Sequence, residues 1–139
     1  PDIELERPEI AWDLIELNQA APQFSWRPTA AENLEYVDAQ RDSSTCYKGV
    51  NAFIHPYFLL DACNKALMRL FVLPAWIHTG SKIILRAPLR VGNCIDVKTM
   101  PIKKWERGGH QFIKLYIAMV IDGVVALEVE HNAIFRIAR

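Results

Sequence analysis

The chain has 139 residues, which is the size of one compact domain. Hydrophobic residues make up 51% and charged residues 23% of it, a composition that excludes disordered, collagen-like and low-complexity proteins. No apolar stretch reaches the roughly 18 residues of a membrane span, and the acidic start of the chain is unlike a signal peptide. Three cysteines without a CxxC pair argue against a disulfide framework or a zinc site. We therefore expect a cytoplasmic protein that uses no metal and does not enter a membrane.

The charge is unevenly spread although the net charge is zero. Residues 1–46 hold 10 acidic and 3 basic side chains, whereas residues 47–139 hold 6 acidic and 13 basic ones. A basic half favours a phosphate-bearing partner, but packing of the two halves against each other would neutralise both. No aromatic and basic recognition motif accompanies the charge, so we expect no nucleic-acid partner.

The first part of the chain gives a weak signal up to Thr29. Prolines interrupt residues 1–28, and residues 10–17 fit a strand or a short helix equally well. Thr29 and Glu32 then form the pattern of a capping box, which predicts a helix over residues 30–40. Residues 41–54 are typical of a loop.

The strongest helix signal begins at His55-Pro56, because proline is favoured at the first helical position. Apolar residues between Tyr57 and Phe71 cover more than half of the helix circumference. An amphipathic surface helix would have a narrower apolar stripe, so this helix is expected to be buried. Pro74 marks its end.

The rest of the chain predicts four long strands, over residues 76–87, 94–105, 110–121 and 124–137. Asp122-Gly123 is a strong hairpin signal, and the short connections predict an antiparallel sheet. A buried helix followed only by long strands has nothing but the sheet to cover it. We therefore predict a single α+β domain over residues 1–139, a sheet curled around a central helix, with residues 1–46 as a strand and helix extension.

Six short segments add a family resemblance to this architecture. They are residues 55–60 (HPYFLL), 76–81 (WIHTGS), 89–93 (LRVGN), 109–112 (GHQF), 122–123 (DG) and 131–135 (HNAIF). In this order they resemble the MaoC-like branch of the hotdog superfamily, whose members act on acyl thioesters. The resemblance covers about residues 47–139. Residues 55–62 are also similar to the HPxLLDA segment of polyketide-synthase dehydratase domains, whose aspartate acts from the central helix.

The resemblance implies a hotdog fold and hydratase or dehydratase activity, which is lyase chemistry, on acyl-CoA or acyl-carrier-protein thioesters. An acyl-CoA thioesterase is the alternative. CoA or phosphopantetheine would be part of the substrate, with no tightly bound cofactor. The resemblance also implies a homodimer or a higher even oligomer whose sheets join edge to edge.

One departure from the family favours a third hypothesis. The hydratases carry an Asp-x-Asn-Pro-x-His loop before the central helix, whereas residues 42–47 (DSSTCY) have no histidine at the fifth step. The third hypothesis is therefore a catalytically silent hotdog domain that binds an acyl group or has a structural role.

The expected catalytic residues lie on the central helix. Its N-terminus carries a partial positive charge, so the N–H groups of Tyr57 and Phe58 would polarise a thioester carbonyl beside His55. His55 would otherwise cap the helix. Asp61 would be a general base or nucleophile, or else the salt-bridge partner of Lys65 one helical turn later.

Further residues are expected around the substrate. Asn51 would orient water or the thioester oxygen, or be an ordinary loop residue, and His131 is expected in the core of its strand. The acyl pocket would be lined by Trp76, His78 and Ser81. Ser81 is not expected to be the nucleophile of a serine hydrolase, because the sequence around it has no G-x-S-x-G motif. Contacts with CoA phosphates would come from Lys103, Lys104 and Arg107, which would otherwise protect a strand edge.

Overall fold

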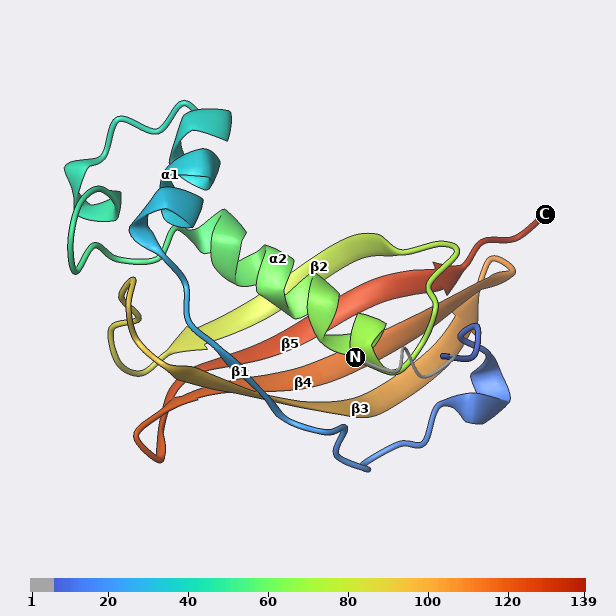
Figure 1. The fold of residues 1–139 in the computed structure, drawn as a ribbon. Helices are drawn as coiled ribbons and strands as arrows, with labels where there is room; N and C mark the ends of the chain where they lie inside the picture. Colours follow the sequence, from blue (N-terminus) through green and yellow to red (C-terminus); the bar gives the residue numbers. More distant parts are fainter. Residues whose placement is uncertain (1–6) are drawn as a thin grey trace.

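Five antiparallel strands form one curled sheet in the computed structural model, which describes residues 7–139 (Figure 1). Their order across the sheet is β1-β3-β4-β5-β2. The bounds are Phe24–Trp26 for β1, Ile77–Leu85 for β2, Ile95–Arg107 for β3, His110–Ile121 for β4 and Val124–Arg136 for β5. The four long strands lie where the sequence predicts them, and β1 is an addition from the weakly patterned start of the chain.

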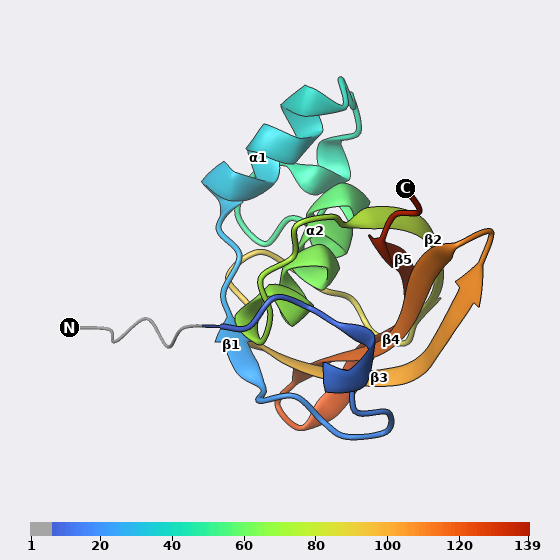
Figure 2. The same ribbon diagram turned by 90° about the vertical axis from the view of Figure 1, so that its right-hand side faces the viewer.

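The central helix α2 spans Pro56–Ala66 and continues into a 3-10 turn, η3, over Leu67–Arg69. Its buried side chains are Phe58, Ala62, Cys63 and Ala66. Figures 1 and 2 show α2 lying inside the curve of the sheet, as predicted. The predicted architecture of a helix wrapped by an antiparallel sheet is therefore confirmed.

The inner face of the sheet supplies the rest of the core through the two-residue alternation of β structure. Ile113, Leu115 and Ile117 on β4 are fully buried, and Leu127 and Val129 on β5 are 1% exposed. These side chains meet the buried face of α2 in one hydrophobic cluster.

The N-terminal region runs along α2, with residues 8–10 beside Val72 after the helix and α1 beside its earlier turns. A 3-10 turn, η1, covers Trp12–Leu14, and β1 pairs with β3, Phe24 opposite Val97. Helix α1 spans Ala30–Ala39 and has both hydrogen bonds of the predicted capping box at Thr29 and Glu32. A second 3-10 turn, η2, covers Thr45–Tyr47. None of the helices in residues 7–139 is both long and apolar enough to cross a bilayer.

Strand β2 is one edge of the sheet, because it pairs only with β5. It is nine residues long and carries exposed apolar side chains, with Ile77 at 46%, Ile84 at 40% and Leu85 at 64% exposure. A long apolar edge with unpaired backbone groups is a surface that natural proteins usually cover or pair.

Asn33 on α1 links the loop before α2 to the rest of the structure. Its side chain is fully buried, and Nδ2 donates to the carbonyl oxygens of Tyr47 (2.8 Å) and Phe53 (2.9 Å). Its Oδ1 accepts a hydrogen bond from the His55 N–H at 2.8 Å. One amide thus pairs three backbone groups that have little access to water.

Replacing Asn33 with leucine is expected to lower the free energy of unfolding by about 3 kcal/mol, because buried backbone groups lose their partners. Urea denaturation measures this change. Asp38→Ala, at an exposed position of the same helix, should change the value by less than about 0.5 kcal/mol. Equal stability of the Asn33→Leu variant and the parent protein would contradict this role.

Candidate functional site

His55 is the N-cap of α2 and is only 3% exposed. Its Nδ1 accepts the N–H of Tyr57 at 3.2 Å, and its Nε2 lies 3.1 Å from Asp42 Oδ2. Because Nδ1 is an acceptor, the ring proton lies on Nε2 and is donated to Asp42. Both ring nitrogens are therefore engaged, as in a capping residue.

Asp42 is the carboxylate that reaches His55 from the loop after α1. Its Oδ1 also accepts the N–H of Ser44 at 2.8 Å. Hydrogen bonds from Ser44, and then from His55, hold the pKa of Asp42 below its usual range. The sequence pattern identifies Asp42 only as the start of a loop motif that lacks its histidine. The structure pairs it instead with a histidine 13 residues later.

The two N–H groups expected to polarise a carbonyl already donate within the protein. The Tyr57 N–H donates to the His55 ring, and the Phe58 N–H donates to the His55 carbonyl at 2.9 Å. The Tyr57 side chain is 54% exposed, whereas Phe58 is buried. A carbonyl at this end of α2 would therefore have to replace the imidazole.

Asp61 faces a cavity of about 350 Å³ between β1, α1 and α2. Its walls include the rings of Phe24, Trp26, Tyr36 and Phe58. Phe58 stacks on Tyr36 with ring centroids 4.5 Å apart and meets Trp26 edge-on at 5.0 Å. His55 does not line this cavity, so the structure separates the two expected catalytic residues.

The Asp61 carboxylate is held by one phenol and one ammonium group. Its Oδ2 accepts the Tyr36 hydroxyl proton and lies 3.1 Å from Lys65 Nζ, so the expected pairing with Lys65 is confirmed. Burial, together with the hydrogen bond to Asp61, raises the pKa of Tyr36 to about 12. Tyr36 therefore remains a hydrogen-bond donor to Asp61 throughout the physiological pH range.

A second polar cluster lies between the later turns of α2 and the strands β2 and β5. It unites Trp76, His78 and Ser81, which were expected together, with His131 and Asn64. The two imidazole rings stack with centroids 4.3 Å apart. The sequence placed His131 in the core but gave no signal that Asn64 would meet it.

The hydrogen bonds of this cluster form a directed chain. The Asn64 Oδ1 accepts the Trp76 Nε1–H at 3.1 Å and the His131 Nε2–H at 2.7 Å. His131 Nδ1 is then an acceptor for the Ser81 hydroxyl at 2.8 Å, and Ser81 accepts the His78 Nε2–H at 2.8 Å. Burial, and next the neighbouring His78, lower the pKa of His131 to about 4.

The remaining expected residues lie apart from both clusters. Asn51 is in a left-handed turn with φ of 59°, where its backbone carbonyl accepts a bond from Arg90. The three basic residues expected to contact CoA lie near the β3–β4 hairpin: Lys103, Lys104 and Arg107. The loop before α2 lies at the other end of β3, where Phe53 forms a β-bridge with Arg90. The Lys104 ammonium donates to the carbonyl oxygens of Trp12 and Ile15. Contact of these cations with CoA stays a prediction.

Comparison with known proteins establishes the fold. No protein-family model matches the sequence, and no curated protein does. The (R)-hydratase from A. caviae has a TM-score of 0.66 and 16% identity, with 86% of this chain and 96% of that chain covered. A MaoC-like dehydratase from Rhodospirillum rubrum has a TM-score of 0.68 and 13% identity, with 94% and 99% covered.

A third similar structure is the HadBC (3R-hydroxyacyl-ACP dehydratase) complex from Mycobacterium tuberculosis. It has a TM-score of 0.71 and 11% identity, with 83% of this chain and 91% of that chain covered. These likenesses confirm the predicted hotdog fold and the structural resemblance to MaoC-like dehydratases.

The buried His131 is expected to make stability depend on pH. The folded state resists protonation down to about pH 4, whereas the unfolded chain takes up a proton near pH 6.5. Stability is therefore fully present above about pH 6.5 and falls as the pH drops toward 4, by on the order of 3 kcal/mol from this residue.

Urea unfolding of the parent protein and of His131→Phe is measured at several pH values in this window. The difference between the two proteins gives the contribution of His131 to the pH dependence of the free energy of unfolding, apart from that of other titrating groups. The variant should lose less stability on acidification. Identical pH slopes for the two proteins would rule out a neutral buried His131.

Proposed function

We propose that the protein is an acyl-thioester hydratase or dehydratase in which Asp61 is the acid–base group. The observation that carries the proposal is a carboxylate on the central helix of a hotdog fold, facing a cavity with aromatic walls. The fold is shared with (R)-hydratases and a 3R-hydroxyacyl-ACP dehydratase, which adds support.

The contacts of Asp61 suit a proton-transfer role. Within residues 7–139, the hydrogen bond from Tyr36 and the ion pair with Lys65 both involve Oδ2. This arrangement fixes the carboxylate and leaves Oδ1 available for a water molecule. Helical side chains lean toward the N-terminus of their helix, so Asp61 leans toward the turn that carries Phe58.

In the hydration direction, Asp61 takes a proton from water while the water oxygen bonds to the β-carbon of an enoyl thioester. The electron pair of the double bond moves toward the thioester carbonyl and gives an enolate. Asp61 then returns the proton to the α-carbon, so that one water is added in total. Dehydration runs through the same steps in reverse.

The enolate oxygen needs a donor, and the proposed one is the Tyr57 N–H at the positive end of α2. Tyr57 does not line the Asp61 cavity, so the proposal requires the thioester to extend from the cavity past Phe58 and to displace the His55 ring from this N–H. Its present bond to His55 is long at 3.2 Å, so a charged oxygen is a competitive acceptor. In this proposal, Asp42 and His55 are positioning residues that hold the helix start.

Substitution of Asp61 with asparagine is expected to lower kcat/KM for hydration of crotonyl-CoA or a longer enoyl-CoA by at least about 100-fold. Tyr36→Phe should lower it by about tenfold, because the carboxylate loses a hydrogen bond that orients it. The loss of enoyl absorbance measures the rate. Asp38→Asn, on the exposed side of α1, is the matched control and should retain the parent rate.

Two outcomes would overturn the assignment. If no enoyl-CoA of any chain length turns over, the hydratase proposal fails. If free thiol is released from acyl-CoA and the release is lost in Asp61→Asn, the protein is a thioesterase that uses the same carboxylate.

We also propose that two chains pair along the open edge of β2. The unpaired backbone and the exposed side chains of Ile77, Ile84 and Leu85 support this edge as the contact. Pairing of two identical edges gives a two-fold dimer with a continuous sheet.

Light scattering at micromolar concentration is expected to give twice the 15.9 kDa of one chain, or an even multiple of it. Ile84→Lys should shift the mass toward a single chain, because a lysine on an edge strand disfavours pairing with another edge. Circular dichroism shows whether the variant is folded. A parent protein that scatters as one chain would refute the dimer.

A further inference from the structure

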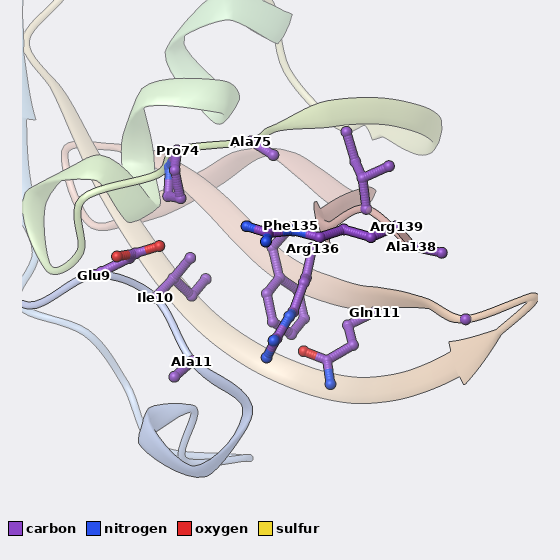
Figure 3. A pocket seen from close by; sticks show the side chains of 12 residues that line it. Glu9, Ile10, Ala11, Pro74, Ala75, Gln111, Phe135, Arg136, Ala138 and Arg139 are labelled. Atoms are coloured by element: carbon purple, nitrogen blue, oxygen red, sulfur yellow. The ribbon is translucent and has the colours of Figure 1, made fainter.

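A second cavity, of about 950 Å³, lies beyond the C-terminal end of the central helix, beside Pro74 and Ala75 (Figure 3). It is bounded by the segment around Ile10, by Pro74 and Ala75 after the central helix, and by the end of β5. Ile10 and Phe135 are 7% and 2% exposed and give it an apolar floor. Its volume is that of a small-molecule site.

Two guanidinium groups reach into this cavity, those of Arg136 and Arg139 (Figure 3). No carboxylate within residues 7–139 lies within salt-bridge distance of either one. Glu9 is the single acidic side chain of the lining, against two guanidinium groups. Guanidinium groups bind carboxylates in a planar, two-point geometry.

The segment that carries the two arginines is held in place by the β3–β4 hairpin. The Ala138 N–H donates to His110 Nδ1 at 2.8 Å. A Cβ atom at Gly109, which has φ of +79°, would lie 2.9 Å from the Ala138 Cβ. The glycine therefore permits a close approach, and the wall of the cavity is a built feature of the fold.

Gln111 adds an unmet hydrogen-bond acceptor beside the charge. Its Nε2 donates to Glu106 at 2.8 Å, which fixes the orientation of the amide. Its buried Oε1 accepts no hydrogen bond from residues 7–139, and Figure 3 shows it turned toward Phe135 and Arg136. Gln111 is paired directly across the sheet with Arg136. A donor for this oxygen must therefore sit close to the group that the arginines bind.

We propose that this cavity binds an aliphatic hydroxycarboxylic acid. The carboxylate lies between Arg136 and Arg139, a hydroxyl on the β-carbon donates to Gln111 Oε1, and the chain covers Ile10 and Phe135. The site is distinct from the cavity of Asp61 and does not depend on the proposed enzyme activity.

The test measures binding of β-hydroxyoctanoate by calorimetry, with two compounds that each lack one feature. Octanoate keeps the charge and the chain but has no hydroxyl, and the methyl ester of β-hydroxyoctanoate keeps the hydroxyl and the chain but has no charge. Both should bind more weakly, the ester by at least about tenfold, because it loses the charge-assisted bonds.

Variants assign each loss to its residue. Arg136→Gln and Arg139→Gln should each weaken both acids by about tenfold and leave the ester unchanged. Gln111→Leu should weaken β-hydroxyoctanoate severalfold without affecting octanoate. Arg27→Gln, which removes the charge of an exposed arginine outside the cavity, should change nothing.

Equal affinity for the acid and its ester, or unchanged binding in the Arg136→Gln/Arg139→Gln double variant, would overturn the proposal, as would no binding at millimolar acid. Asp61→Asn should bind β-hydroxyoctanoate like the parent protein. This result separates failure of the ligand site from failure of the proposed catalytic role.

Discussion

The hydrogen-bonded start of α2 is the constraint on which the rest of the structure depends. The free N–H groups at the start of a helix need acceptors, and here the protein supplies them around the buried His55. Asn33 fixes the backbone of His55, and the His55 ring then caps the helix and donates to Asp42. The direction of α2 follows from this set of bonds, and with it the side of the helix that presents Asp61.

The same chain of bonds explains the separation of His55 from the cavity. Its two ring nitrogens are occupied by the helix N-terminus and by a loop carboxylate. Asp61, in the second turn of the helix, has one oxygen held by a phenol from α1 and an ammonium group from its own helix. His55, with both ring nitrogens engaged, is therefore suited to hold the start of the helix in place. Asp61, with one free oxygen at the cavity, is suited to proton transfer.

Sequence patterns predicted the elements whose signal is local. The capping box at Thr29, the proline after His55 and the hairpin at Asp122-Gly123 each act within a few residues, and the structure has all three features. A strand was predicted within residues 1–46, but its position at β1 could not be predicted, because three residues carry no periodicity and the partner β3 is about 70 residues away. The contact of Asp42 with His55 and that of Asn64 with His131 likewise join distant segments.

The expected grouping of Trp76, His78 and Ser81 shows how register limits such predictions. Alternation alone places residues 78 and 81 on opposite faces of a strand, but a register shift between His78 and Gly80 turns His78 toward the Ser81 hydroxyl. The polar cluster therefore depends on one irregularity that no residue pattern specifies.

The two proposed sites draw on different parts of this architecture. The Asp61 cavity is formed where the N-terminal region crosses α2, and the basic cavity is formed where the chain after β5 meets the β3–β4 hairpin. Hydration of an enoyl thioester gives a β-hydroxyacyl thioester, and hydrolysis of that thioester by a further water gives a β-hydroxy acid and the free thiol. The two proposals thus concern related compounds. The Asp61 cavity would recognise the acyl chain of the thioester through its aromatic walls, and the basic cavity would recognise the carboxylate of the acid through its two guanidinium groups.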